Sequence, residues 1–133
     1  MASIRKELQL DADAADVWAA LADFGAVDKR VAPGFVVSSQ LDGDRRSVKF
    51  ANGVEAVETL VSRDDETRRL VYAIIGGRMA HYNAALQVFA EGPDRSRLVW
   101  TIDLLPNDFA AYIGDQMETA CKAMKPTLEG QAA

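Results

Sequence analysis

The chain has 133 residues, of which 49% are hydrophobic and 26% are charged, and its net charge is −5. This length and balance predict one globular domain, residues 1–133, with a substantial core. The negative charge and the scattered Lys and Arg residues argue against nucleic acid or an anionic membrane as partner. A single cysteine excludes an internal disulfide and a cysteine-rich metal site, so we expect no metal and no cofactor.

The first predicted elements are a strand and two short helical segments. Residues 3–10 alternate apolar and polar side chains, as a half-buried strand does. Asp13 is a candidate N-cap for a helix over residues 14–22, because its carboxylate can accept hydrogen bonds from the free N–H groups of the first turn. A second helical turn is expected over residues 26–31. Pro33 and the glycine after it then break the chain.

Six more strands are predicted in quick succession, at residues 35–41, 46–51, 54–62, 68–75, 81–90 and 97–105. Short turn sequences separate them, and Asn52-Gly53 is a strong hairpin signal. Connections this short predict antiparallel neighbours. In the last strand the alternation favours Trp100 on the inward face.

The last predicted element is an amphipathic helix over residues 106–128, with Asn107 as its N-cap. Pro126 is expected to bend or fray its last turn. The apolar residues form one stripe at helical spacing: Phe109, Ile113, Met117, Ala120, Cys121, Met124 and Leu128. Such a helix needs a large apolar partner surface, which the strands can supply. The predicted fold is α+β: a curved, seven-stranded antiparallel sheet wrapped around the C-terminal helix.

Several stretches resemble the START/Bet v 1-like helix-grip superfamily, in its bacterial polyketide cyclase/dehydrase and lipid-transport-like (SRPBCC) branch. The plant abscisic-acid receptors show related stretches in the same order. The resemblance covers nearly the whole chain and implies a cavity between the sheet and the long helix that holds a small apolar or amphiphilic molecule. The stretches that carry it are VWAALADF at 17–24, Pro33-Gly34, Glu58-Thr59-Leu60, Ile74-Ile75-Gly76-Gly77 and His81-Tyr82.

By position, the resemblance implies a set of cavity-lining residues, to which we add an apolar wall from the last strand and the helix. The receptors' pocket lysine is replaced by Pro33, and their gate and latch loops are not matched at residues 51–53 and 77–80, so hormone sensing is not implied. The receptor comparison would also turn Asp103 inward, against the alternation, and its orientation stays open. The implied lining is Glu58, Tyr72, Ile74, Tyr82 and Ala84, and the added wall is Trp100, Ile113, Met117 and Cys121.

Glu58 is the best single candidate for chemistry. A carboxylate in an apolar cavity tends to have a raised pKa and could act as a general acid or base, or bind a ligand hydroxyl. The alternative is a structural glutamate, either buried and held by a neighbouring arginine or tyrosine or lying at the solvated mouth of the cavity. Tyr72 and Tyr82 would each add one polar tip to the cavity. His81, the only histidine, is expected opposite Tyr82, and we do not expect it to face the same way as Asp103.

Three functions remain open at this level. The first is binding of a small hydrophobic or amphiphilic molecule in the cavity. The second is an enzyme of cyclase or dehydratase type without a metal, with Glu58 as base and Tyr82 as hydroxyl donor. The third is a partner-binding module whose cavity is filled by its own side chains. The N-terminal residues lack a signal-peptide core and no run is long enough to cross a bilayer, so we expect a cytoplasmic protein.

Overall fold

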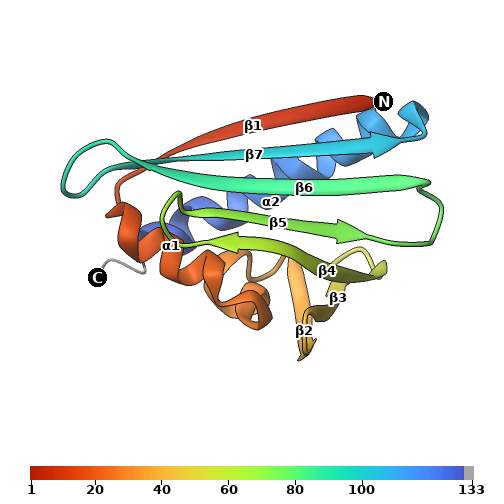
Figure 1. Cartoon of the computed structure of the whole chain (residues 1–133), viewed down its shortest axis with the longest axis horizontal. Coiled ribbons are helices and arrows are strands. Elements are labelled where there is room, and N and C mark those ends of the chain that lie inside the picture. The colour runs from red at the N-terminus through yellow and green to blue at the C-terminus, as the bar shows by residue number, and fades with distance from the viewer. Residues whose placement is uncertain (131–133) are drawn as a thin grey trace.

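The structure is a computed structural model that describes residues 1–130. One long helix, α2, lies against a seven-stranded sheet, and the short helix α1 lies near one end of that sheet (Figure 1). The elements are β1 (Ala2–Leu10), α1 (Ala14–Ala22), the 3₁₀ turn η1 (Phe24–Ala26), the π turn η2 (Val27–Val31), β2 (Val36–Asp42), β3 (Arg45–Phe50), β4 (Glu55–Asp64), β5 (Arg69–Ile74), β6 (His81–Ala90), β7 (Ser96–Leu105), the 3₁₀ turn η3 (Asn107–Phe109) and α2 (Ala110–Gly130).

All strands belong to one antiparallel sheet in the order β1-β7-β6-β5-β4-β3-β2. Its register shifts between Val36 and Ser38 in β2 and between Leu60 and Ser62 in β4. Such irregularities bend and twist a strand, which helps this half of the sheet to curve around the core. The predicted helix-grip fold is confirmed, with both short helical segments between the first and second strands.

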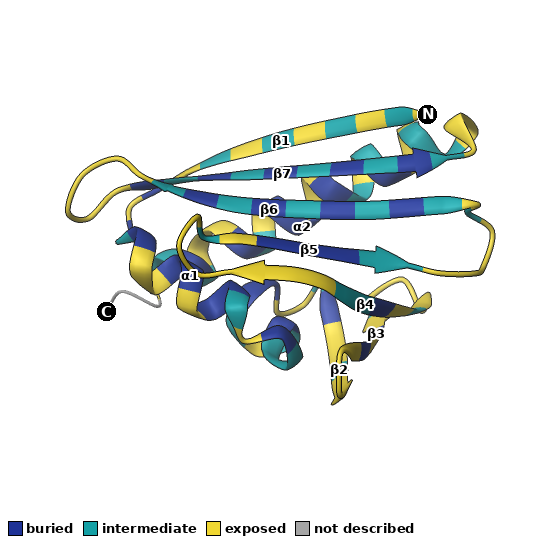
Figure 2. Ribbon diagram, viewed as in Figure 1, coloured by how far each residue is buried: buried dark blue, intermediate teal, exposed yellow. Residues whose placement is uncertain are grey.

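Strand β7 alternates between buried and partly buried residues along its whole length, and β6 does so up to Phe89, visible as bands in Figure 2. Trp100 is buried, as the alternation predicted, and Asp103 lies on the outer face. The inward Asp103 implied by the receptor comparison was therefore wrong. Asp103 pairs with Asn83, two residues from His81, so His81 and Asp103 share the outer face after all. Our expectation that they would face different ways was also wrong.

The N-cap predicted for α1 is confirmed, because Asp13 Oδ1 accepts a hydrogen bond from Ala15 N at 3.2 Å. The side chain of Trp18, on the buried face of α1, reaches the turn between β4 and β5. Its Nε1 donates to Asp65 Oδ1 at 2.9 Å. This bond fixes α1 against one end of the sheet.

The start of α2 differs from the prediction. Asn107 opens the 3₁₀ turn η3, and the α-helix itself begins at Ala110, so Asn107 is not its N-cap. Pro126 was expected to bend or fray the last turn, and fraying does not occur, since α2 continues to Gly130. Leu128 is fully buried and Glu129 accepts a hydrogen bond from Asp11 N at 2.7 Å, and both contacts hold the last turn in place.

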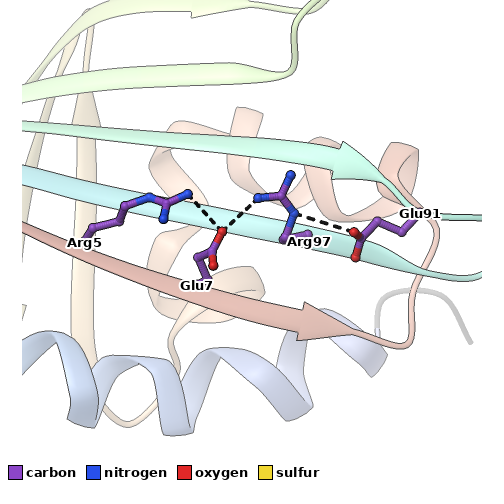
Figure 3. A network of polar contacts seen from close by, with 4 residues as sticks. All are labelled: Arg5, Glu7, Glu91 and Arg97. Atoms are coloured by element: carbon purple, nitrogen blue, oxygen red, sulfur yellow. Dashed lines mark hydrogen bonds and ion pairs between the residues drawn. The ribbon is translucent and has the colours of Figure 1, made fainter.

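Polar contacts join α2 and β7 to β1. Lys6 Nζ of β1 donates to Glu118 Oε1 of α2 at 2.6 Å. On the outer face, Glu7 accepts from both Arg5 and Arg97, and Arg97 also contacts Glu91 (Figure 3). The hydrogen bond from Arg97 is the main reason that the pKa of Glu7 is lowered. These charges are solvent-exposed, so they contribute little to stability. Within residues 1–130, no helix is long and apolar enough to cross a bilayer.

Candidate ligand-binding site

A cavity of about 90 Å³ lies between the sheet and α2. We call it the chamber. Its walls come from the α1–η2 segment, the inner face of the sheet and one side of α2, and they are mostly apolar. The lining residues are Leu21, Val27, Val31, Ala32, Phe35, Val36, Arg46, Phe50, Glu58, Leu70, Tyr72, Tyr82, Leu86, Trp100, Ile102, Ile113, Gln116, Met117, Ala120 and Met124.

A wider apolar pocket of about 750 Å³ adjoins the chamber. We call it the vestibule. It lies between the β3–β4 turn, the β5–β6 loop and the start of α2, and it is lined by Phe35, Phe50, Asn52, Val54, Glu55, Ala56, Ile74, Gly76, Gly77, Arg78, Met79, Tyr82, Phe109, Tyr112, Ile113 and Gln116. The two spaces share Phe35, Phe50, Tyr82, Ile113 and Gln116. These five side chains therefore form the boundary between the inner and outer parts of one site.

The chamber contains a buried ion pair. Arg46 Nε donates to Glu58 Oε1 at 2.7 Å, and the two residues are only 4% and 5% exposed. They lie directly opposite each other in β3 and β4, on the inner face. Arg46 Nη1 also donates to Phe24 O at 3.0 Å, and the guanidinium lies 3.9 Å from the centre of the Phe24 ring.

Of the interpretations left open for Glu58, the structure shows the glutamate held by an arginine. Arg46 was not among the predicted site residues. A signal was present, because Arg46 has the same parity as the buried Val48 and lies across a short hairpin from Glu58. Charged residues are rarely buried unless they are paired, so an inward arginine would have been the natural partner for an inward carboxylate.

Two tyrosines add polar tips to the chamber. Tyr72 and Tyr82 are 5% and 8% exposed. Burial raises the pKa of both hydroxyls well above their usual range, and the negative charge of Glu58 adds to the rise, while Arg46 opposes it. Both groups therefore stay protonated at ordinary pH and present an O–H donor.

Trp100 contributes the remaining polar group of the sheet wall. Its indole Nε1 is enclosed and has no hydrogen-bond partner within the described part of the chain. The indole lies close to the Tyr72 hydroxyl and acts to lower its pKa, against the larger effect of burial. The two groups do not have the geometry of a hydrogen bond. The chamber is thus lined by one neutralised ion pair, by Tyr72, Tyr82 and Trp100 from the sheet, and by Gln116 from α2.

The other predicted site residues fall into three groups. Ile113 and Met117 line the chamber, as Glu58, both tyrosines and Trp100 do, and Ile113 also borders the vestibule. Ile74 lines the vestibule but not the chamber. Ala84 and Cys121 are buried but line neither space. Burial raises the pKa of the Cys121 thiol, and Glu118 adds to the rise, so this cysteine is a core residue with little thiolate character. Among residues 1–130, no three His, Cys, Asp or Glu side chains gather closely enough to hold a metal ion.

The fold and the cavity define a helix-grip protein. The chain belongs to the family described as polyketide cyclase / dehydrase and lipid transport, whose model matches residues 1–133. None of the curated proteins compared matches the chain.

Solved structures show the same fold. A protein of Bacillus thuringiensis is 17% identical, with a TM-score of 0.84 over 96% of this chain and 98% of that one. A Thermobifida fusca protein is 29% identical, with a TM-score of 0.76 over 97% of this chain and 91% of that one. A START superfamily protein of Mycobacterium smegmatis is 12% identical, with a TM-score of 0.76 over 98% of this chain and 96% of that one. The family match confirms the suspected polyketide cyclase/dehydrase and lipid-transport-like branch, and the solved structures confirm its fold.

Proposed function

We propose that the protein binds a small apolar or amphiphilic molecule whose polar end enters the chamber and whose apolar part lies in the vestibule. The observation that carries this proposal is that the two spaces adjoin and share five lining residues. Ligand pockets usually measure about 300–1,000 Å³. The chamber of about 90 Å³ is too small alone, whereas the vestibule of about 750 Å³ falls in this range.

The chemistry of the lining supports the same function. An apolar wall with a few convergent polar groups binds the body of a ligand by burial and orients it by hydrogen bonds. Here the buried polar side chains Arg46, Glu58, Tyr72, Tyr82 and Trp100 line the chamber, and the walls of both spaces are mostly apolar. An apolar molecule with one polar end matches such a lining, and the family description includes lipid transport.

Blocking the boundary between the two spaces tests the proposal. Ile113→Trp should fill this boundary, and Ala111→Trp on the exposed side of the same helix is the matched control. The fluorescent ketone 6-propionyl-2-(dimethylamino)naphthalene is titrated into each protein. We expect saturable binding to the wild type and to Ala111→Trp, and at least tenfold weaker binding to Ile113→Trp. Equal binding to all three would contradict the proposed site, and absence of binding would favour the partner-binding module.

A second candidate is cyclase or dehydratase chemistry in the same cavity. The observation that favours it is a carboxylate, Glu58, buried in one chamber with the protonated hydroxyls of Tyr72 and Tyr82. A bound ketone could lose an α-proton to Glu58 while Tyr82 donates a hydrogen bond to the carbonyl oxygen. The family description includes both activities.

Glu58→Gln tests the enzymatic candidate with a poly-ketone as substrate. We expect turnover to be lost while binding of the ketone probe persists, and unchanged turnover would remove Glu58 as the base. The substitution also weakens the buried pair with Arg46, so unfolding must be measured alongside. Glu66→Gln is the control, since Glu66 lies in the turn after the same strand, is exposed and lines neither space.

A further inference from the structure

The two tryptophans of the chain differ in the hydrogen bonding of their indole N–H groups. Trp18 Nε1 donates to Asp65 Oδ1 at 2.9 Å. Trp100 is equally buried, at 8% exposure, but its Nε1 has no partner within residues 1–130. An indole N–H can only donate, and an enclosed donor without an acceptor is costly. Because Trp100 lines the chamber, a ligand that enters there lies beside the indole ring and can bring an acceptor to this donor.

A second donor lies beside it. In the sheet, Tyr72 of β5 pairs with Ala84 of β6. Leu86, two residues further along β6 and on the same face, pairs with Trp100 of β7. The Trp100 side chain acts on the pKa of the Tyr72 hydroxyl, so the two groups lie close to each other on the inner face. Since the Tyr72 hydroxyl stays protonated, the indole N–H and the phenol O–H are two donors that one acceptor atom could satisfy.

The charge of the chamber restricts the ligand further. Arg46 and Glu58 neutralise each other at 2.7 Å, so the lining has no net charge to offer. An ionised head group would enter without a counter-charge, and an unpaired buried charge is strongly destabilising. The inner end of the ligand should therefore be neutral and should accept hydrogen bonds.

We propose that Trp100 Nε1–H and Tyr72 O–H together bind one neutral carbonyl oxygen, of a ketone or an ester, at the inner end of the ligand. Trp100 is then a specificity-determining residue that selects an oxygen-headed molecule over a hydrocarbon of the same shape. This inference rests on the proposed function, since it assumes that a ligand occupies the chamber.

The experiment compares two probes with the same shape. The first is 6-propionyl-2-(dimethylamino)naphthalene, and the second is its 6-propyl analogue, which lacks only the carbonyl oxygen. Indole N–H resonances are recorded on ¹⁵N-labelled protein with each probe. Trp18→Phe identifies the Trp100 signal and serves as the matched control, because Trp18 does not line the chamber. We expect the ketone to move the Trp100 proton downfield and the propyl probe to leave it in place.

Affinities give the second readout. Trp100→Phe should bind the ketone about tenfold more weakly, the usual effect of losing one hydrogen bond, and should bind the propyl probe unchanged. Tyr72→Phe should weaken ketone binding by several-fold. If both probes bind the wild type equally and neither moves the Trp100 resonance, the inference is wrong while the proposed function stands. If neither probe binds, both fail. The resonance measured in the wild type decides the matter even where a variant does not fold.

Discussion

The inner and outer parts of the cavity are built in opposite ways. In the chamber, Arg46 bonds to Glu58 and to the Phe24 carbonyl, and each of these groups is buried. At the vestibule, an exposed bond from Asn52 Nδ2 to Tyr112 Oη, 3.0 Å long, joins the β3–β4 turn to α2. Tyr112 is 45% exposed, against 5% for Tyr72.

Because of this difference, the chamber is suited to recognising a ligand and the vestibule to admitting and releasing it. The chamber is surrounded by paired strands and α2, so its polar groups are held in fixed positions. The vestibule is bordered by turns, and at Gly76 and Gly77 the chain has φ values of +90° and +75°, which glycine adopts without strain. Turns can rearrange at less cost than packed strands. We therefore expect changes in the chamber to alter stability and selectivity, and changes at the vestibule to alter the rates of ligand entry and release.

The largest effect is expected from breaking the buried ion pair. Arg46→Met leaves Glu58 buried without its counter-charge, and such losses cost about 3–5 kcal/mol. Urea unfolding measures the change. Arg45→Met, one residue earlier and exposed, is the matched control and should stay within about 0.5 kcal/mol of the wild type.

The double variant Arg46→Met/Glu58→Leu sharpens this result. Replacing both charges with apolar side chains removes the unpaired carboxylate, so most of the lost stability should return. If the double variant were as unstable as the single one, the packing of Arg46 against Phe24 would matter more than the charge pair.

The next effect concerns alkaline pH. The ordinary pKa of a tyrosine, 10.0, applies to the unfolded chain, and burial raises the pKa of Tyr72 and Tyr82 in the folded state. Their stabilising contribution is thus complete below pH 10 and is lost as pH rises further, by about 1.4 kcal/mol per pH unit for each tyrosine. Urea unfolding between about pH 9 and pH 11 should show a shallower decline for Tyr72→Phe and Tyr82→Phe. An unchanged decline would mean that these hydroxyls ionise in the folded protein.

The smallest effect on stability is expected at the vestibule. Tyr112→Phe removes only the acceptor of the bond from Asn52, and the free energy of unfolding should change by no more than about 0.5 kcal/mol. Release of the naphthyl ketone, followed by stopped-flow fluorescence, should nevertheless become a few times faster, because the β3–β4 turn is no longer joined to α2. Release at the wild-type rate would show that this bond does not control access.

Much of the fold follows from local patterns in the sequence. The order of the strands, the inward face of Trp100 and the apolar stripe of α2 depend on periods of two and 3.6 residues, which short segments carry by themselves. Asp13 capped its helix as expected, because a cap is a contact between near neighbours. Asn107 did not, because the chain turns once more before α2 begins at Ala110.

The site depended on the tertiary structure. The sequence placed Glu58, Tyr72 and Tyr82 in a common cavity through a resemblance, but it missed Arg46, which joins Glu58 only once β3 and β4 adopt their register. Nor could it show that Ala84 and Cys121 pack outside the cavity, or that Trp100 lacks a partner where Trp18 has one. Each of these outcomes depends on distances between residues far apart in the chain, and such distances exist only after the sheet has closed around α2.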